Sequence, residues 1–433
     1  MPNSRSARTA AVLTVGALSV FGLAACGSSS GDDTDGVTLE YMHRLPDGEG
    51  MTSVNEIVER WNEENPDVQV NATKFDGEAS DMILKLETDS KADNAPCLAQ
   101  LGYAEVPQVY AKGLLQDVSE EAAKYEDNFS SGAFSGMRVG DAVVGIPQDT
   151  GPLVYFYNEA EFEELGIEVP ATLDDLTESS AIAAKEDKFI TAFTPDEAHN
   201  WLSGQAAAAG DVWFTTEGDE WQVDAEGPGS QVVAEFWQHL IDEEQTLTTE
   251  RWGEAFDKAL TDGKLIGHVG AAWEAGFLLD SLDGSDAEGQ WRVAQLPDFG
   301  AGEMTGPDGG SGVAVMKSCE HPAEAMEFNN WFNTQIDDLA SQGLVVAATT
   351  DTPNTSEKME RQFGGQDVLG ELAEATENLN PDFGFAPGFS TLTKMNETAA
   401  DAASGSATVA DVFTTAQETI VGAMKDLNLP VAE

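Results

Sequence analysis

Positive charge, cysteine and histidine are all scarce in this sequence. Its 433 residues include 21 Lys and Arg against 78 Asp and Glu, which gives a formal net charge of −57. Because nucleic acid binding needs a basic surface that neutralises phosphates, this balance excludes nucleic acid as a partner. The three cysteines and five histidines show neither Cys-x-x-Cys nor His-x-x-x-His spacing. We therefore expect no metal site and no cofactor.

The acidic excess says less about the ligand. A strongly negative field repels anions and favours a neutral or cationic ligand. A heavily solvated exterior nevertheless explains most of this charge without reference to function. Charge alone therefore leaves the ligand class open.

Long apolar runs are also nearly absent. One run, at 10–25, follows Arg5 and Arg8 with no acidic residue before it. A basic start and a short apolar centre are typical of a secretory signal peptide. The run is short for a membrane-spanning helix and rich in small residues, and no later run reaches membrane length. We expect the rest of the chain to be soluble.

The end of this run, "LAAC" at 23–26, resembles the lipobox of bacterial lipoproteins. The resemblance implies cleavage before Cys26, a diacylglycerol on its sulfur, and an acyl chain such as palmitate on the new N-terminus. We expect a signal peptide at 1–25 and a flexible Ser/Gly/Asp tether at 26–36. The lipid would hold the protein on the extracytoplasmic face of the cell membrane. A plain signal peptide with an incidental cysteine is the alternative.

The remaining chain is long for one compact domain. Removal of 25 residues from 433 leaves 408, which suits two lobes. The residue pattern predicts a strand at 37–42, a helix then a strand within 53–70, and another helix then strand within 81–101. This βαβ alternation indicates an α/β fold with a mostly parallel sheet covered by helices. A further helix is expected at 407–427.

Four later segments carry more specific motifs. They are "APCLAQLGYAEVPQVYAKGLLQDVSE" (95–120), "GDAVVGIPQDTGPLVYFYNEAEFEELGIEVPATLDDL" (140–176), "FDKALTDGKLIGHVGAAWEAG" (256–276) and "GGSGVAVMKSCEHPAEAMEFNNWF" (309–332). In this order they resemble the extracellular solute-binding proteins of carbohydrate ABC importers. The chain departs from that pattern at Cys97, where the family usually has Asp, and at Gly267-His268, where Ala-Met is usual.

The resemblance implies a two-lobed, periplasmic-binding-protein-like α/β fold with an interlobe ligand cleft. It also implies three hinge crossings, near Asp149, near 297–308 and near 344–350. Lobe 1 would comprise 37–148 and 309–345, and lobe 2 would comprise 149–300 and 350–433. Ligand binding would then close the lobes about these hinges.

The family's motifs also point to ligand-binding residues. Trp273 follows three small residues at the end of an expected strand, where the family has a sugar-stacking aromatic, and Glu274 comes next. A core position is the alternative for this Trp. Asp149, at the first crossing, would bind sugar hydroxyls, with a turn-capping role as its alternative.

Other candidates follow from position in the fold. His199, Asn200 and Trp201 begin an expected helix that faces the cleft, and helical geometry prevents all three from sharing one face. Loops at the carboxyl ends of strands, a glycine-rich strand entrance and a late phenylalanine cluster add further candidates. These are His43, Tyr103, Gly310 and Ser311. From the cluster of Phe383, Phe385 and Phe389 we choose Phe389.

These features predict a monomeric, lipid-anchored receptor that captures a neutral sugar and delivers it to the permease subunits of an ABC importer. They favour an oligosaccharide over a monosaccharide as the ligand. A binding protein of the same fold for a cation or polyamine is one alternative. A secreted glycosidase is another, although no nucleophile elbow, HExxH or phosphate loop is present, so we expect no enzyme and no catalytic residue. Whether Cys97 and Cys319 form a disulfide remains open.

Overall fold

The computed structural model describes residues 36–433, except for 49–50, 78, 219, 352–353, 356 and 433. The predicted signal peptide, Cys26 and nearly all of the tether therefore lie outside the described residues. Within the described part of the chain, no helix is both long enough and apolar enough to cross a membrane.

The first three strands confirm the βαβ reading. Strands β1 (Val37–His43), β2 (Val68–Lys74) and β3 (Leu98–Gly102) are parallel in the order β2–β1–β3, joined by α1 (Val54–Glu64) and α2 (Ala79–Lys91). Ser53 begins α1 because its hydroxyl accepts from the N–H of Glu56, whose carboxylate accepts from the N–H of Ser53. The Asn65-Pro66 pair then ends the helix before β2.

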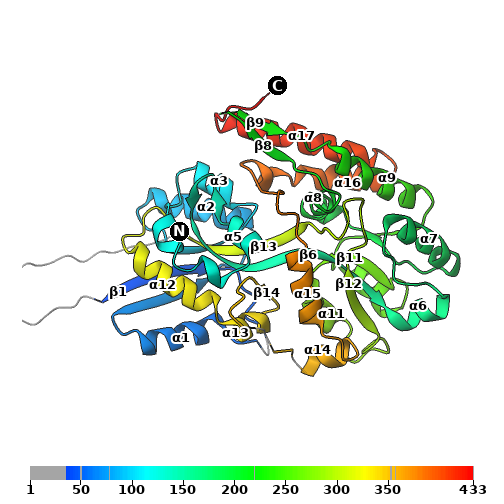
Figure 1. Cartoon of the computed structure of the whole chain (residues 1–433), viewed down its shortest axis with the longest axis horizontal. Coiled ribbons are helices and arrows are strands. Elements are labelled where there is room, and N and C mark those ends of the chain that lie inside the picture. The colour runs from blue at the N-terminus through cyan, green and yellow to red at the C-terminus, as the bar shows by residue number, and fades with distance from the viewer. Residues whose placement is uncertain are drawn as a thin grey trace, which may run out of the picture. The chain divides into compact units, whose positions relative to one another are not determined.

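The rest of the main sheet runs antiparallel, so the expectation of a mostly parallel sheet is wrong. Strand β13 (Pro307–Val315) pairs antiparallel with β3 and with the 14-residue β6 (Gly145–Asn158). Strands β11 (Gly267–Ala271), β12 (Trp291–Gln295) and β14 (Val345–Val346) are also antiparallel to β6. The reason is that β6 runs outward through the middle of the molecule, and the strands that follow return alongside it (Figure 1).

Helices cover both faces of this sheet (Figure 1). The remaining α-helices are α3 (Val106–Ala111), α4 (Ser119–Ala122), α5 (Ser131–Ser135), α6 (Glu159–Leu165), α7 (Leu173–Ala183), α8 (Ala198–Ala208), α9 (Pro228–Asp242), α10 (Glu254–Thr261), α11 (Glu274–Ser281), α12 (Pro322–Asn333), α13 (Ile336–Ser341), α14 (Glu357–Gln362), α15 (Val368–Glu377), α16 (Lys394–Ala403) and α17 (Val409–Asp426). Short 3-10 helices are η1 (Glu126–Asn128), η2 (Ala184–Glu186), η3 (Pro195–Glu197) and η4 (Phe389–Thr391). The minor strands are β4 (Arg138–Val139), β5 (Ala142–Val143), β7 (Ala192–Phe193), β8 (Phe214–Glu217), β9 (Glu220–Val223) and β10 (Leu247–Thr248).

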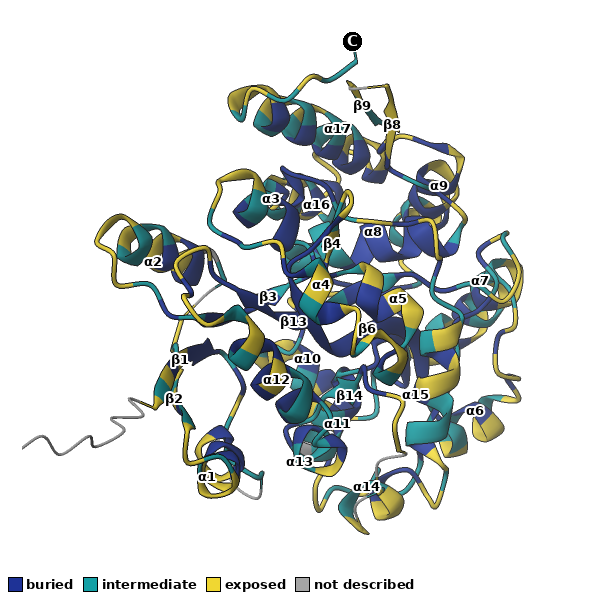
Figure 2. Ribbon diagram, turned by 60° about the vertical axis from the view of Figure 1, so that its left-hand side comes forward, coloured by how far each residue is buried: buried dark blue, intermediate teal, exposed yellow. Residues whose placement is uncertain are grey.

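The buried apolar residues define two lobes that share β6. One core takes its members from 39–146 and 313–348. Beyond Gly151, successive β6 side chains alternate between two further cores: Leu153 and Tyr155 face one, Val154 and Phe156 the other. Figure 2 shows β6 and β13 buried at the centre of the chain. The described chain is thus a two-lobed α/β fold, as the sequence predicts.

A disulfide closes part of the first lobe. Cys97, just before β3, is bonded to Cys319, in the turn that follows β13, with 4.5 Å between their Cα atoms. The bond joins two segments that are 222 residues apart in the sequence and neighbours in the sheet. The fold therefore shows the Cys97–Cys319 disulfide, which the sequence alone leaves open.

Candidate ligand-binding site

The start of β13, Asp308 to Ser311, touches several residues predicted from the sequence. The Asp308 carbonyl accepts a hydrogen bond from Trp273 Nε1 at 3.0 Å. Gly309 and Gly310 have φ of +95° and +91°, values that favour glycine. A Cβ on Gly309 would lie 3.2 Å from Trp273 Nε1, and one on Gly310 would lie 2.8 Å from the Tyr103 ring. The glycines therefore let both aromatic rings lie directly against the strand.

Asp149 is fixed on the neighbouring strand. Its Oδ1 accepts from Ser311 Oγ at 2.5 Å, and its carbonyl accepts from the Tyr103 hydroxyl at 2.8 Å. The side chain is almost fully buried, and this burial raises its pKa to about 6, with the hydrogen bonds from Ser311 opposing the rise. Near pH 6 the carboxyl group is therefore present in both forms, one of which is a hydrogen-bond donor.

Trp273 is the partly exposed aromatic of the candidate site. It follows β11 and immediately precedes α11, with the Arg251 guanidinium carbon 4.8 Å from its ring centroid. Phe277, one helical turn later, packs against it at an interplanar angle of 69°, with 5.4 Å between ring centroids. An aromatic ring held on one side and partly open on another offers an apolar surface of the kind that stacks on the C–H face of a sugar.

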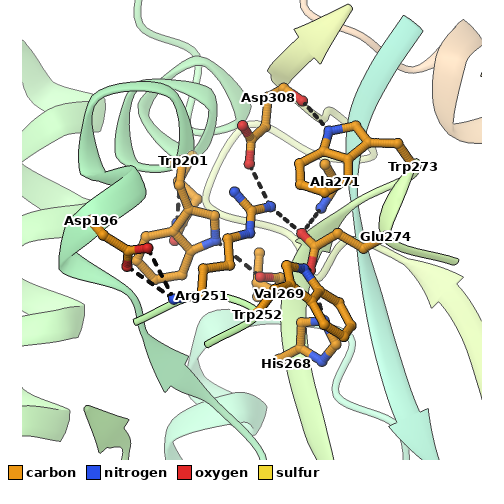
Figure 3. Close-up of polar contacts among 11 residues, drawn as sticks. Asp196, Trp201, Arg251, Trp252, His268, Val269, Ala271, Trp273, Glu274 and Asp308 are labelled. Carbon is orange, nitrogen blue, oxygen red and sulfur yellow. Dashed lines mark hydrogen bonds and ion pairs between the residues drawn. The ribbon is translucent and has the colours of Figure 1, made fainter. Parts of the chain in front are cut away.

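A buried charge cluster lies under Trp273 (Figure 3). Arg251 forms an ion pair with Glu274 and a second with Asp308 at 2.8 Å. Glu274 also accepts from Trp252 Nε1 at 2.9 Å and lies 3.2 Å from His268 Nε2. Burial alone would raise the pKa of Glu274, but the charges and hydrogen bonds of Arg251 and His268 together outweigh it and lower that pKa to about 2. Because these contacts occupy its carboxylate, we leave Glu274 out of the proposed ligand contacts.

Helix α8 splits the three residues predicted at its start. His199 and Asn200 are partly exposed, with Asn200 Nδ2 3.2 Å from His199 Nε2. Trp201 is buried in the core, where its Nε1 donates to the Val269 carbonyl at 2.9 Å and its ring packs on Trp237 with 4.7 Å between centroids. The geometric limit predicted from the sequence therefore holds, and Trp201 is corrected from ligand contact to core residue.

Two other predicted residues also lie in the core. Phe389 is fully buried and packs edge-on against Phe385, with 4.9 Å between centroids. His43 is 2% exposed beside Tyr41, and burial lowers its pKa to about 4. His43 is the last residue of β1 and not part of the loop after it, and membership of a phenylalanine cluster does not specify which way the Phe389 side chain points. They too are left out of the proposed contacts.

Both lobes contribute to a cavity of about 630 Å³. Of the residues predicted from the sequence, only Tyr103 lines it. Sequence reasoning missed most of its wall, including Arg138, Thr150, Thr376, Glu377 and Asn380, whereas Phe383 and Phe385 were named as candidates but not chosen. The phenylalanine cluster does point to this cavity, but Phe389, the member chosen from the sequence, does not line it. Thr150 and Thr376, whose hydroxyls lie 3.0 Å apart, come together only through the fold. Among the described residues, no cluster of three or more His, Cys, Asp or Glu side chains is placed to hold a metal ion.

Two α/β lobes joined by shared strands, with an interlobe cavity and a partly exposed tryptophan beside the joining strands, define the class of two-lobed ligand-binding proteins. The chain belongs to the bacterial extracellular solute-binding protein family, whose sequence profile matches residues 46–336. This confirms the family resemblance, and it confirms the prediction of a binding protein in place of an enzyme.

Three individual relatives are named as sugar-binding proteins. A solved structure of the galacto-N-biose/lacto-N-biose I-binding protein of an ABC transporter from Bifidobacterium longum, in complex with lacto-N-biose, is 53% identical with a TM-score of 0.88, and the match covers 93% of this chain and 100% of that one. The arabinooligosaccharide-binding protein of Halalkalibacterium halodurans is 22% identical over 81% of each chain. A maltooligosaccharide ABC transporter solute-binding lipoprotein of Streptococcus pneumoniae is 26% identical over 75% of this chain and 76% of its own.

Proposed function

We propose that this protein captures a neutral sugar and delivers it to the permease subunits of an ABC importer. The ligand we favour is lacto-N-biose, galacto-N-biose or a closely related short oligosaccharide. The observation that carries this choice is the 53% identity with the Bifidobacterium longum protein over 93% of the chain. The distant relatives, whose names specify other oligosaccharides, support the broader class of ligand.

We place the ligand contacts at the start of β13 and the residues around it. Trp273 supplies an apolar ring face, while the carboxyl, hydroxyl and amide groups nearby match sugar hydroxyls. The proposed contacts are Trp273, Asp149, Tyr103, His199, Asn200, Gly310 and Ser311. Their support is the contact that β13 makes with Trp273, Tyr103 and Asp149.

Calorimetric titration of residues 27–433 tests the ligand class. We expect saturable binding of lacto-N-biose or galacto-N-biose and weaker binding of maltose and arabino-oligosaccharides. Spermidine serves as the cationic comparison, because the net charge of −57 would favour it. Spermidine binding with no response to any sugar would overturn the sugar assignment.

Substitutions locate the site. Trp273→Ala should weaken sugar binding by more than tenfold, since a central aromatic contact is worth about 2 kcal/mol. Trp221→Ala, on the partly buried β9, is the matched control and should leave affinity unchanged. If Phe385→Ala, in the interlobe cavity, removes binding while Trp273→Ala does not, the sugar lies in the cavity and our placement is wrong.

We also propose the lipid anchor, the monomeric state and the lobe boundaries given by the sequence. The "LAAC" segment ending at Cys26 supports lipidation, as does the lipoprotein name of the Streptococcus pneumoniae relative. Core residues drawn from 39–146 and 313–348 support the division into 37–148 with 309–345 and 149–300 with 350–433, joined by three crossings. Cys26→Ser should move the protein from the membrane fraction to the soluble fraction without changing sugar affinity. A change in affinity would contradict this separation of anchor and binding unit.

A further inference from the structure

The indole of Trp273 is held from three sides, and Arg251 is the centre of that arrangement. The guanidinium lies over the ring with 4.8 Å from its carbon to the ring centroid. The ring nitrogen donates to the carbonyl of Asp308, and the carboxylate of the same Asp308 is paired with Arg251 at 2.8 Å. Phe277 packs against the same ring with its plane at 69° to the indole. The orientation of Trp273 and the position of Arg251 are therefore linked through one residue of β13.

Arg251 is itself held in place by buried ion pairs and by backbone hydrogen bonds. Its side chain is 3% exposed and is paired with the fully buried Glu274 as well as with Asp308. Its backbone N–H donates to both carboxylate oxygens of Asp196, at 3.0 and 3.1 Å. Both pairs use the same guanidinium nitrogen, Nη2, while the flat guanidinium as a whole lies over the Trp273 ring, where a lysine has no planar group to place.

The residue after Arg251 is held in an uncommon conformation. Trp252 has φ of +54°, a left-handed value that is rare for a bulky residue. Its Nε1 donates to Glu274 Oε2 at 2.9 Å, so one carboxylate holds both Arg251 and Trp252. Such conformations persist where surrounding contacts over-determine them and concentrate at functional sites.

We propose that Arg251 is a positioning residue for sugar binding: it fixes the indole of Trp273 in the orientation that stacks on the ligand. It acts through Trp273 and does not itself touch the sugar. This inference rests on the proposed function and adds to it a residue outside the family motifs and outside the cavity wall. Pre-organisation of this kind raises affinity because the ring does not have to be ordered when the sugar binds.

A double-mutant cycle tests the coupling. Arg251→Lys keeps the charge but loses the planar group that lies over the indole, and should weaken sugar binding about tenfold, within the range of coupling found for residues in contact. In the Trp273→Ala background the same substitution should change affinity less than about twofold. Arg292→Gln, which breaks the partly exposed pair of Arg292 with Glu159 in the same lobe, is the matched control and should leave affinity unchanged in both backgrounds.

A second variant covers the case in which Arg251→Lys does not fold, since loss of a buried pair can be strongly destabilising. Glu274→Gln keeps the shape of the side chain and removes one of the two charges that hold Arg251. It should weaken binding about threefold with Trp273 present and have no effect without it. A variant that lowers the melting temperature while leaving affinity unchanged would show a structural role only and overturn the inference.

The two proposals fail in distinguishable ways. If the wild-type protein binds no sugar, the proposed function fails and this inference fails with it. If the wild-type protein binds sugar and the effects of Arg251 and Trp273 are additive, only the positioning role is wrong.

Discussion

At the scale of single residues, Gly310 shows how a backbone conformation shapes the candidate site. Its φ of +91° and the Tyr103 ring, 2.8 Å from where a Cβ would lie, both exclude a side chain. Gly310→Ala should lower the free energy of unfolding by about 2 kcal/mol, from the left-handed backbone and the clash together. Urea denaturation measures this loss.

Gly343, which also has a positive φ but no atom close to the position of an added Cβ, separates the cost of the backbone conformation from the cost of the clash. Gly343 has φ of +85°, and no atom lies within 4 Å of a Cβ built there. Gly343→Ala should therefore show the smaller, conformational part of the loss. Equal losses at the two positions would mean that the Tyr103 ring moves aside without cost.

Glu197 gives the site a pH dependence. Burial raises its pKa from 4.5 to about 7, opposed by the charge of Arg251 and reinforced by the charges of Asp308, Asp196 and Glu274. The folded state then holds the proton more tightly than the unfolded chain. Its contribution to stability is therefore fully present below about pH 4.5 and is lost as the pH rises through about 7.

Glu197→Gln removes this titration. The variant should gain stability relative to the wild type between about pH 5 and pH 8, as measured by urea denaturation at each pH. The exposed Glu243→Gln controls for the loss of one negative charge. A stability difference for Glu197→Gln that stays flat with pH would contradict the raised pKa.

The sequence predicts residues with a motif around them better than residues that depend on tertiary contacts. Trp273 and Asp149 stand in recognisable segments, and both lie at the joining strands in the structure. Arg251 has no such signal, because its acidic partners Glu274 and Asp308 reach it only in the fold. His43 fails in the opposite way: the sequence predicts it in the loop after the first strand, but it is the last residue of β1 and its side chain is buried.

At the scale of elements, strand existence is predictable and strand direction is not. The pattern locates all three of β1, β2 and β3 because each alternates with a helix, although β2 continues to Lys74, four residues beyond the predicted segment. The direction of β13 depends on where the preceding chain ends, which periodicity does not encode. The final helix, predicted at 407–427, is α17 at Val409–Asp426, and the prediction is close because the amphipathic pattern is long and begins at a threonine cap.

That cap offers a test of local stability. Thr408 Oγ1 accepts from the Asp411 N–H, and the Asp411 carboxylate accepts from the Thr408 N–H at 2.8 Å. Thr408→Ala should lower the free energy of unfolding by about 1 kcal/mol. Asp411→Ala should cost a similar amount, and the double variant should cost less than the sum, because both bonds belong to one capping box. Fully additive losses in thermal or urea unfolding would contradict this.

At the scale of the whole molecule, the disulfide joins the parts of lobe 1 that the second lobe separates in sequence. Cys97 and Cys319 close a loop of 222 residues, which restricts the unfolded chain. The Cys97→Ser, Cys319→Ser double variant should be less stable by about 2–5 kcal/mol. Reductant should produce a similar loss in the wild type and none in the variant, and an unchanged wild type under full reduction would show that the bond adds no stability.

The placement of β13 between β3 and β6 also sets the order in which the sheet becomes complete during synthesis. A chain made from its N-terminus presents β2, β1 and β3 long before residues 307–315 exist, so the β3 edge stays unpaired while most of the second lobe is being added. An unpaired edge strand is a site for pairing with other chains. During this stage the unpaired edge of β3 can pair with a strand of another chain. The risk of such aggregation ends only when β13 has been synthesised and pairs with β3.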